Sequence, residues 1–279
     1  MKVKGEKASA SKAIIGNSPY IRDDEVFIRM NLAERIQHIV LIITFFILIV
    51  TGLPLVFYEF KFLKPIFSLE KSFYIRGIIH RVTAVGLILN VIWHVCYMIF
   101  TKRGRNNLKE LLPRLKDFKD AFELFWHNVG LMRSVYRRGF LKKFFKSHPY
   151  WLFKRAPEFG RYSFIEKFEY WTLVSGSAVM IISGFFMSNV EFSLSLFPLW
   201  LHDIFIIVHR YEALLAFLAI IIWHMYNVHL NPEAFPMSKV WLNGKITGKE
   251  LRTLHPLEYR KILEERKRDW ILDNREENW

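Results

Sequence analysis

The sequence predicts an all-α integral membrane protein, a bundle of four transmembrane helices. The first observation is the composition, because 52% of the 279 residues are hydrophobic and 16% are aromatic. The second is their distribution: four stretches of 20 to 23 residues contain no Asp, Glu, Lys or Arg, namely 36–58, 82–101, 170–190 and 213–232. About 20 helical residues cross the hydrocarbon core of a bilayer, and a helix satisfies its own backbone there. A secreted, fibrous or disordered protein is thereby excluded.

The segments outside the four stretches are charged and give the predicted domain organisation. Residues 1–30 carry charges of both signs and no apolar core, so the first helix is expected to be retained and not cleaved as a signal peptide. We predict an N-terminal segment 1–33, a transmembrane domain 34–230 containing a long loop 102–163, and a C-terminal tail 231–279. Within the loop, Leu108 to Trp126 has helical periodicity interrupted by Pro113, which predicts an interfacial helix.

The net charge of +14 is distributed unequally between the two sides of the predicted bundle. Sixteen Lys and Arg lie between Thr101 and Arg161, whereas Asn189 to His202 contains none. The positive-inside rule therefore predicts that the N-terminus, the long loop and the tail are cytoplasmic. This segregation, without a recognition motif, also argues against nucleic-acid binding.

Four histidines recur in the second and fourth helices, within or just before the uncharged stretches, with nearly the same spacing. The second helix has His80-Arg near one end and Trp-His94 near the other, and the fourth has His209-Arg and Trp-His224. Spacings of 14 and 15 residues return to roughly the same helix face about 21 Å further along the axis. Facing helices would therefore form two histidine sites, one near each membrane surface.

Haem is the cofactor that best suits paired imidazoles inside a helical bundle. Intramembrane histidines are costly and are functional by default. A flat haem accepts one axial imidazole from each side, and small residues of the neighbouring helices leave room for it. The only cysteine, Cys96, cannot supply a covalent attachment motif, so the haem is expected to be b-type. Arg81 and Arg210 each follow a histidine and are candidates for pairing with haem propionates.

The first and third helices extend the repeat. Glu34-Arg-Ile-Gln-His38 corresponds to Glu166-Lys-Phe-Glu-Tyr170, and Thr51-Gly52 corresponds to Ser183-Gly184. Helices one and two therefore look like a diverged duplicate of helices three and four. Tyr170 stands in the place of His38, so the third helix is expected to supply no ligand.

Several short motifs resemble those of the membrane di-haem cytochrome b subunits of respiratory formate dehydrogenase (the gamma subunit) and related periplasmic oxidoreductases. The resemblance covers roughly Leu32 to Leu263. Its motifs are Glu34-Arg-Ile-Gln-His38 with Gly52, Gly160-Arg-Tyr-Ser-Phe-Ile-Glu-Lys167, Trp223-His224-Met-Tyr226, Asn243-Gly244-Lys245 and His255-Pro-Leu-Glu-Tyr-Arg260.

The resemblance implies an outer haem held by His80 and His209 and an inner haem held by His38 and His224. His94 has no counterpart in that family, whereas the internal repeat, and the helix pairing of bc-type cytochromes, would give the inner haem to His94 instead. We favour His38, because its Glu-Arg-x-x-His setting matches the closer family, and keep His94 as the alternative ligand.

The resemblance also implies a function and partners. The chain would be the electron-transfer subunit of an oxidoreductase complex in the inner membrane of a prokaryote, passing electrons across the membrane between an extracytoplasmic subunit and menaquinone or ubiquinone. That subunit would carry iron–sulfur clusters or several c-type haems, would accompany a catalytic subunit, and would dock over the outer loops 59–74 and 189–202. Ser163 and Glu166 replace the Asn and Gln that usually line the quinone site, and Glu166 could exchange protons with quinone. The alternative from the residues is a haem-free anchor for a catalytic partner.

Overall fold

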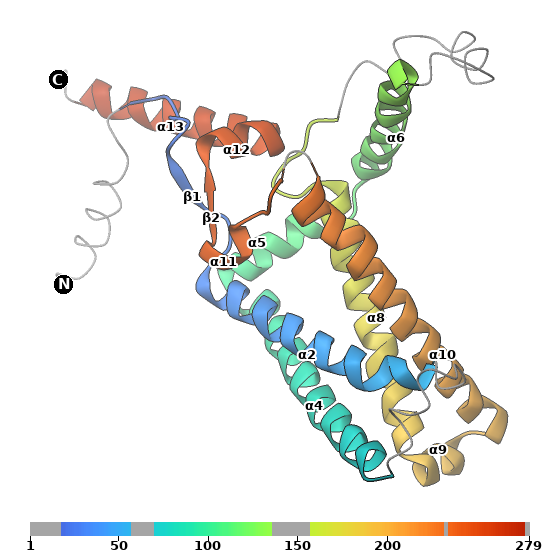
Figure 1. The fold of residues 1–279 in the computed structure, drawn as a ribbon. Coiled ribbons are helices and arrows are strands. Elements are labelled where there is room, and N and C mark those ends of the chain that lie inside the picture. The colour runs from blue at the N-terminus through green and yellow to red at the C-terminus, as the bar shows by residue number, and fades with distance from the viewer. Residues whose placement is uncertain (1–17, 57–69, 136–156, 232–233, 277–279) are drawn as a thin grey trace, which may run out of the picture. The chain divides into compact units, whose positions relative to one another are not determined.

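A computed structural model describes residues 18–56, 70–135, 157–231 and 234–276 (Figure 1). Four of its helices are long and apolar enough to cross a membrane: Leu32–Leu55, Tyr74–Phe100, Phe164–Ser188 and Leu199–Leu230. Helix dominates the described residues, so the predicted all-α membrane fold with four spanning helices is confirmed. The chain is a multi-pass membrane protein.

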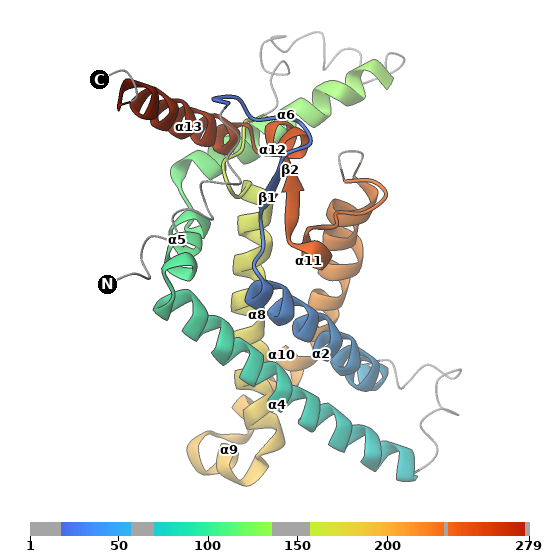
Figure 2. The same cartoon turned by 90° about the vertical axis from the view of Figure 1, so that its left-hand side faces the viewer.

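The first compact unit comprises Met30–Pro113 and Ile165–Gly244 and contains the spanning helices. Helix α2 (Leu32–Val56) packs along α4 (Glu70–Phe100) and also contacts α10 (Leu199–Leu218) (Figure 2). α4 begins 12 residues before the uncharged stretch 82–101. The helix can include Arg76 and Arg81 because charged side chains are tolerated near the end of a membrane-spanning helix. Aliphatic side chains cover the outward faces, among them Ile43 on α2 and Val82 on α4, which are exposed and suited to lipid contact.

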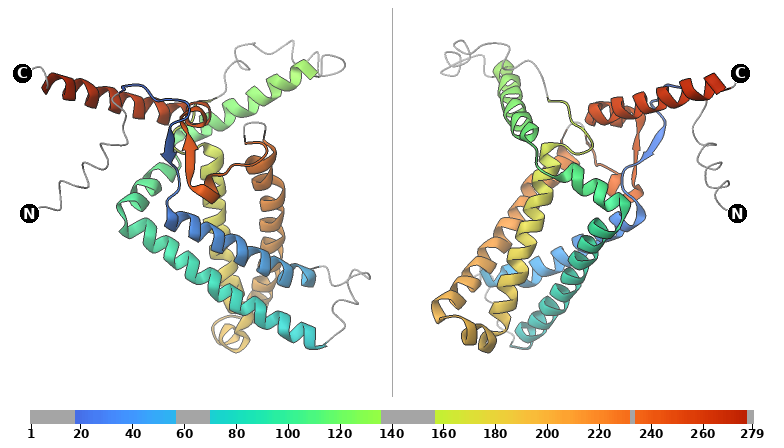
Figure 3. Two further views of the ribbon diagram at one scale, coloured as in Figure 1. Left: turned by 60° about the vertical axis from the view of Figure 1, so that its left-hand side comes forward. Right: turned by 180° about the vertical axis from the view of Figure 1, so that it is seen from behind.

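Helices α8 (Phe164–Ser188) and α10 form the second half of this unit and lie side by side (Figure 3). The short helix α9 (Val190–Leu196) connects them. The fourth span does not stay α-helical, because η2 (Ala219–His224) and η3 (Tyr226–Leu230) follow α10 as π-helix. The unit also contains α5 (Lys102–Leu111) and the single turn α11 (Val240–Asn243).

The second unit is assembled from three separate parts of the chain, and its described residues carry most of the charged side chains outside the spans. Strand β1 (Val26–Ile28) pairs antiparallel with β2 (Lys245–Thr247), so that Phe27 lies opposite Ile246. Helix α12 (Gly248–Leu254) starts with a capping box formed by Thr247 and Glu250 and is followed by α13 (Pro256–Glu276). The sequence did not predict this small β-ribbon, because a three-residue strand has too few residues for a period-2 pattern to be visible.

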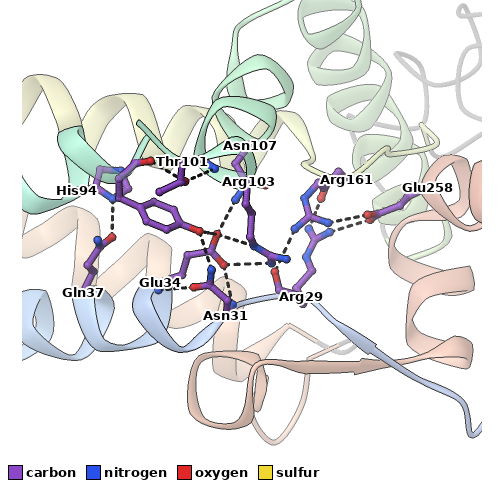
Figure 4. A network of polar contacts seen from close by, with 12 residues as sticks. Arg29, Asn31, Glu34, Gln37, His94, Thr101, Arg103, Asn107, Arg161 and Glu258 are labelled. Carbon is purple, nitrogen blue, oxygen red and sulfur yellow. Dashed lines mark hydrogen bonds and ion pairs between the residues drawn. The ribbon is translucent and has the colours of Figure 1, made fainter. Parts of the chain in front are cut away.

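An ion-pair cluster joins these parts of the second unit (Figure 4). Both oxygens of the Glu258 carboxylate are used, at 2.9 Å from Arg29 Nη1 and 3.0 Å from Arg161 Nη1. Both guanidinium groups also lie over the ring of Tyr162, at 5.2 and 5.6 Å from its centroid. One carboxylate therefore ties the N-terminal segment, the segment before α8 and the C-terminal tail together.

The predicted helix break at Pro113 is confirmed, since α5 ends at Leu111 and α6 (Leu115–Val135) begins after the proline. The interfacial position of this region stays a prediction, as does the division of the chain at residues 33 and 231. Of the expected docking loop 59–74, residues 59–69 lie outside the described part of the chain.

Candidate functional site

The structure brings His80 of α4 and His209 of α10 together, as the repeat predicts. Their ring centroids lie 6.4 Å apart, with an angle of 71° between the ring planes. A metal–imidazole bond is about 2 Å long, so two imidazoles that bind one metal from opposite sides have centroids about 6 Å apart. The separation of His80 and His209 therefore fits a shared metal atom.

A hydroxyl group fixes the orientation of His80. Thr51 of α2 lies 2.8 Å from His80 Nδ1 and also 2.7 Å from the carbonyl oxygen of Ile47 one turn earlier. The carbonyl can only accept, so the single hydroxyl proton is donated to it, and the oxygen must accept a hydrogen bond from Nδ1–H. His80 is then the tautomer whose Nε2 carries a lone pair, which is the form that binds metal.

The second half of the repeat holds His209 in the same way. Ser183 of α8 lies 3.0 Å from His209 Nδ1 and donates its proton to the carbonyl oxygen of Val179 at 2.6 Å. The same reasoning gives a protonated Nδ1 and a lone pair on Nε2. In both histidines a hydroxyl group on the preceding spanning helix therefore accepts the Nδ1 proton and leaves Nε2 free to bind metal.

The glycine after each hydroxyl residue makes room for the imidazole. A Cβ atom at Gly52 would lie 3.1 Å from His80 Cε1, and one at Gly184 would lie 2.9 Å from His209 Cε1. Contacts that short leave no space for a methyl group unless the ring moves. The Thr-Gly and Ser-Gly dipeptides in the two halves thus act together, one residue orienting the ring and the next leaving space for it.

At the opposite end of the spans, His224 is held by a carboxylate. Glu169 of α8 places Oε2 3.1 Å from His224 Nδ1, and its Oε1 accepts a hydrogen bond of 3.0 Å from Asn227 Nδ2. A carboxylate oxygen accepts, so His224 Nδ1 donates and its Nε2 retains the lone pair. No described residue bonds to the buried Nδ1 of His38, whose ring centroid lies 6.3 Å from that of Trp241.

His94 is engaged on both ring nitrogens. Nδ1 lies 3.0 Å from Gln37 Oε1 on α2 (Figure 4). Nε2 lies 3.2 Å from the hydroxyl of Tyr170 on α8. Gln37 and Glu169 occupy equivalent positions of the repeat, as do His38 and Tyr170. The pair of His94 and Tyr170 is therefore the repeat equivalent of the pair of His224 and His38, with tyrosine in place of one histidine.

The π-helical segment explains why the two histidine spacings differ by one residue. His80 and His94 are 14 residues apart, whereas His209 and His224 are 15 apart. A π-bulge accommodates one extra residue in a helix and often occurs at functional sites. η2 ends at His224, so it absorbs the extra residue and returns His224 toward the face of His209. The unequal spacing of the histidines is the sequence signal for this feature.

The two predicted propionate partners lie on exposed positions of the helices. Arg210 donates a hydrogen bond of 3.1 Å to the carbonyl oxygen of Leu55. Arg76 was missed by sequence reasoning, although it lies one turn before His80 on the same face of α4 and contacts the carbonyl oxygen of Thr51. The i, i+4 spacing of Arg76 and His80 could have identified it.

The two predicted quinone residues lie at the start of α8. Ser163 directly precedes the helix and Glu166 lies in its first turn, and both are half-buried. Near the same end of the spans, Glu34 of α2 accepts hydrogen bonds from Arg103 at 3.0 Å, from Asn107 at 2.7 Å and from Tyr97 at 2.9 Å (Figure 4). This polar cluster fixes α2 against α4 and α5.

Four apolar spans with histidines oriented for metal binding define a class of protein, the membrane proteins that hold a metal-containing cofactor between their helices. The family profile of prokaryotic cytochrome b561 matches residues 29–234, which include all four spans. The chain belongs to this family, whose members bind b-type haem. A comparison with curated proteins returned no match.

Family membership confirms a large part of the sequence interpretation. The chain is a membrane b-type haem protein with a role in electron transfer, and it contacts lipid. The resemblance to the formate dehydrogenase gamma subunit agrees with this family. The alternative of a haem-free anchor does not agree with it.

Proposed function

We propose that the chain holds two b haems and carries electrons across the inner membrane of a prokaryote, between an extracytoplasmic redox subunit and the quinone pool. The observation that carries this proposal is the arrangement of His80 and His209, which face each other at 6.4 Å between ring centroids. Thr51 and Ser183 hold both rings with Nε2 ready to bind metal. Bound haem supplies a one-electron couple, and the protein supplies its axial ligands, orientation and surroundings.

The outer haem is assigned to His80 and His209, and the inner haem to His38 and His224. The tautomer of His224 supports its role, because Glu169 accepts the proton of Nδ1. His38 is assigned as its partner because Glu34-Arg-Ile-Gln-His38 matches the motif of the formate dehydrogenase gamma subunits. A haem on His94 would require breaking the hydrogen bond between Nε2 and Tyr170, so the alternative ligand is disfavoured.

Arginine side chains near the outer pair are suited to the carboxylates of a haem. Arg81 and Arg210 follow the two histidines directly and reach the exposed surface of the helices. Arg76, one turn from His80, adds a third cation on the same side. We assign propionate pairing to this group of arginines.

Quinone binding is assigned to the inner end of the bundle, with Ser163 and Glu166 as contacting residues. Reduction of a quinone takes up two electrons and two protons, and a carboxylate at the aqueous boundary can transfer protons. Glu166 occupies such a position in the first turn of α8. Menaquinone and ubiquinone present the same pair of carbonyl groups, so either satisfies this chemistry.

The partner is an extracytoplasmic subunit with iron–sulfur clusters or several c-type haems, joined to a catalytic subunit. The absence of Lys and Arg between Asn189 and His202 supports an extracytoplasmic position for the loop containing α9. The basic loop and tail then lie in the cytoplasm with both termini. A tag placed after Trp279 should be reachable in opened vesicles and not in intact cells.

Substitution of each candidate inner ligand tests the assignment. His38→Ala should remove the inner haem or make it high-spin, because one axial bond is lost. His94→Ala should keep two low-spin haems, since it removes a hydrogen-bonding partner of Tyr170 and not a ligand. Visible and electron paramagnetic resonance spectra, with haem quantified per chain, distinguish these results.

If His94→Ala loses the inner haem and His38→Ala keeps it, His94 is the inner ligand and His38 is not. Low-spin spectra retained in both variants would refute both assignments. His209→Ala serves as the outer-site reference and should leave about half of the haem. An unchanged haem content in that variant would refute the outer pair.

A further inference from the structure

The imidazoles proposed as ligands do not receive the same hydrogen-bonding partner. His80 and His209 donate from Nδ1 to neutral hydroxyl groups, those of Thr51 and Ser183. His224 donates instead to the Glu169 carboxylate at 3.1 Å. The two ends of the bundle therefore differ by one negative charge placed directly behind an axial ligand.

The second oxygen of this carboxylate is also held in place. Asn227, three residues after His224 on the π-helical segment, donates a hydrogen bond of 3.0 Å to Glu169 Oε1. Side-chain exposure is 21% for Glu169 and 29% for His224, so the pair is partly shielded from water. Both carboxylate oxygens thus have donors on the same helix, which fixes the carboxylate relative to the imidazole.

We propose that Glu169 is a positioning residue that orients His224 and lowers the reduction potential of the inner haem relative to the outer one. This inference rests on the proposed function, since it takes His224 as an inner ligand. A carboxylate bound to the distal N–H of a metal-binding histidine fixes the ring and makes it a more basic ligand. A more basic ligand and a nearby negative charge both favour the oxidised, more positive iron.

The internal repeat supplies a natural variant for the test. At the position equivalent to Glu169, Gln37 accepts a hydrogen bond from His94 Nδ1 with its side-chain amide oxygen at 3.0 Å. Glu169→Gln therefore introduces an arrangement that the fold already contains. The amide keeps the acceptor for His224 and removes only the charge, and Asn227 can present its own amide oxygen to the new NH₂ group.

The experiment is a spectroscopic redox titration of the purified full-length chain with both haems bound. Glu169→Gln should keep two haems per chain and should favour reduction of the inner haem by about tenfold, because it removes the negative charge behind His224 and makes the imidazole a less basic ligand. For a one-electron couple, tenfold corresponds to a rise of about 59 mV. The midpoint of the outer haem should stay where it is in the wild type.

Ser183→Ala is the matched control, because it removes the hydroxyl behind His209 and should alter only the outer haem. An unchanged inner midpoint in Glu169→Gln, with both haems present, would overturn the inference and leave the haem assignment standing. Loss of the haem in His224→Ala tests the assignment separately. If Glu169→Gln loses the inner haem, Glu169→Asp decides: a restored low-spin haem supports the positioning role, and its loss there overturns it.

Discussion

Replacing Gly184 with alanine should displace one axial histidine without touching its ring. The new Cβ would lie 2.9 Å from His209 Cε1 and 3.3 Å from His209 Nδ1. Carbon atoms attract best at about 3.5–4.0 Å, so the ring has to move by roughly 0.6 Å or more. Any such movement changes the 3.0 Å contact between His209 Nδ1 and the Ser183 hydroxyl.

The magnitude follows from the usual cost of overpacking. An added methyl group in a well-packed interior costs about 1–3 kcal/mol, which corresponds to roughly 5- to 150-fold in binding affinity. Gly184→Ala should therefore lower the occupancy of the outer haem, and Gly52→Ala should do so less, because its Cβ lies 3.1 Å from His80 Cε1. The assay is haem quantified per chain, together with oxidised-minus-reduced spectra.

Gly86 provides the matched control on α4. A Cβ atom there would lie 3.7 Å from Thr44 Cγ2, which is an ordinary contact, so Gly86→Ala should keep the wild-type haem content. Wild-type haem content and spectra in Gly184→Ala would refute the packing argument. An equal loss in Gly86→Ala would show that alanine disturbs the bundle in general and not the histidine.

Three further predictions concern other contacts. Thr51→Val should weaken the outer haem by about 10- to 100-fold, measured by haem titration, because Nδ1 of His80 loses its acceptor. Glu258→Ala should destabilise the C-terminal tail by about 3 kcal/mol, measured by limited proteolysis, because it leaves the Arg29 and Arg161 guanidinium groups without their shared carboxylate. Acidification should loosen α13, measured by hydrogen exchange. The hydrogen bond from Arg266 lowers the pKa of Glu25, so the stabilisation is present at neutral pH and is lost as pH falls through that lowered pKa.

Each of these predictions has a control and a contradicting result. Thr51→Ser keeps the hydroxyl and should bind the outer haem as the wild type does. If Thr51→Val also binds this haem as tightly as the wild type, the hydroxyl has no role in binding. Glu123→Ala removes an exposed ion pair with Lys119 and should change stability by less than about 1 kcal/mol. If the tail of Glu258→Ala resists protease as well as the wild-type tail does, the ion-pair cluster does not stabilise the tail. Glu25→Gln should abolish the acid effect on α13.

The spanning helices were predictable because hydrocarbon imposes a simple length and charge rule. The four uncharged stretches locate all four spans, and the helix break at Pro113 follows from the chemistry of proline. The ends of α4 were less predictable, since Arg76 and Arg81 are charged and still lie within the helix. Charged side chains near a membrane surface are tolerated, so a charge does not mark the end of a helix.

The sequence predicts the candidate ligands of the site. It does not predict the residues that form hydrogen bonds with those ligands. Repetition of His-Arg and Trp-His identifies the histidines, and the structure places His80 beside His209. The roles of Thr51 and Ser183 require knowing that two helices approach each other, which no local pattern reveals. The contact between Glu169 and His224 is not predictable either, because a carboxylate at the edge of a span resembles an ordinary interfacial charge.

The central claim is that one chain holds two b haems, each between two histidines. The most direct measurement is the ratio of haem to protein in the purified full-length chain, from the pyridine haemochrome spectrum and amino-acid analysis. The account predicts two haems per chain with the low-spin spectrum of two axial histidines. A ratio of one, or a second haem with a high-spin spectrum, would contradict it.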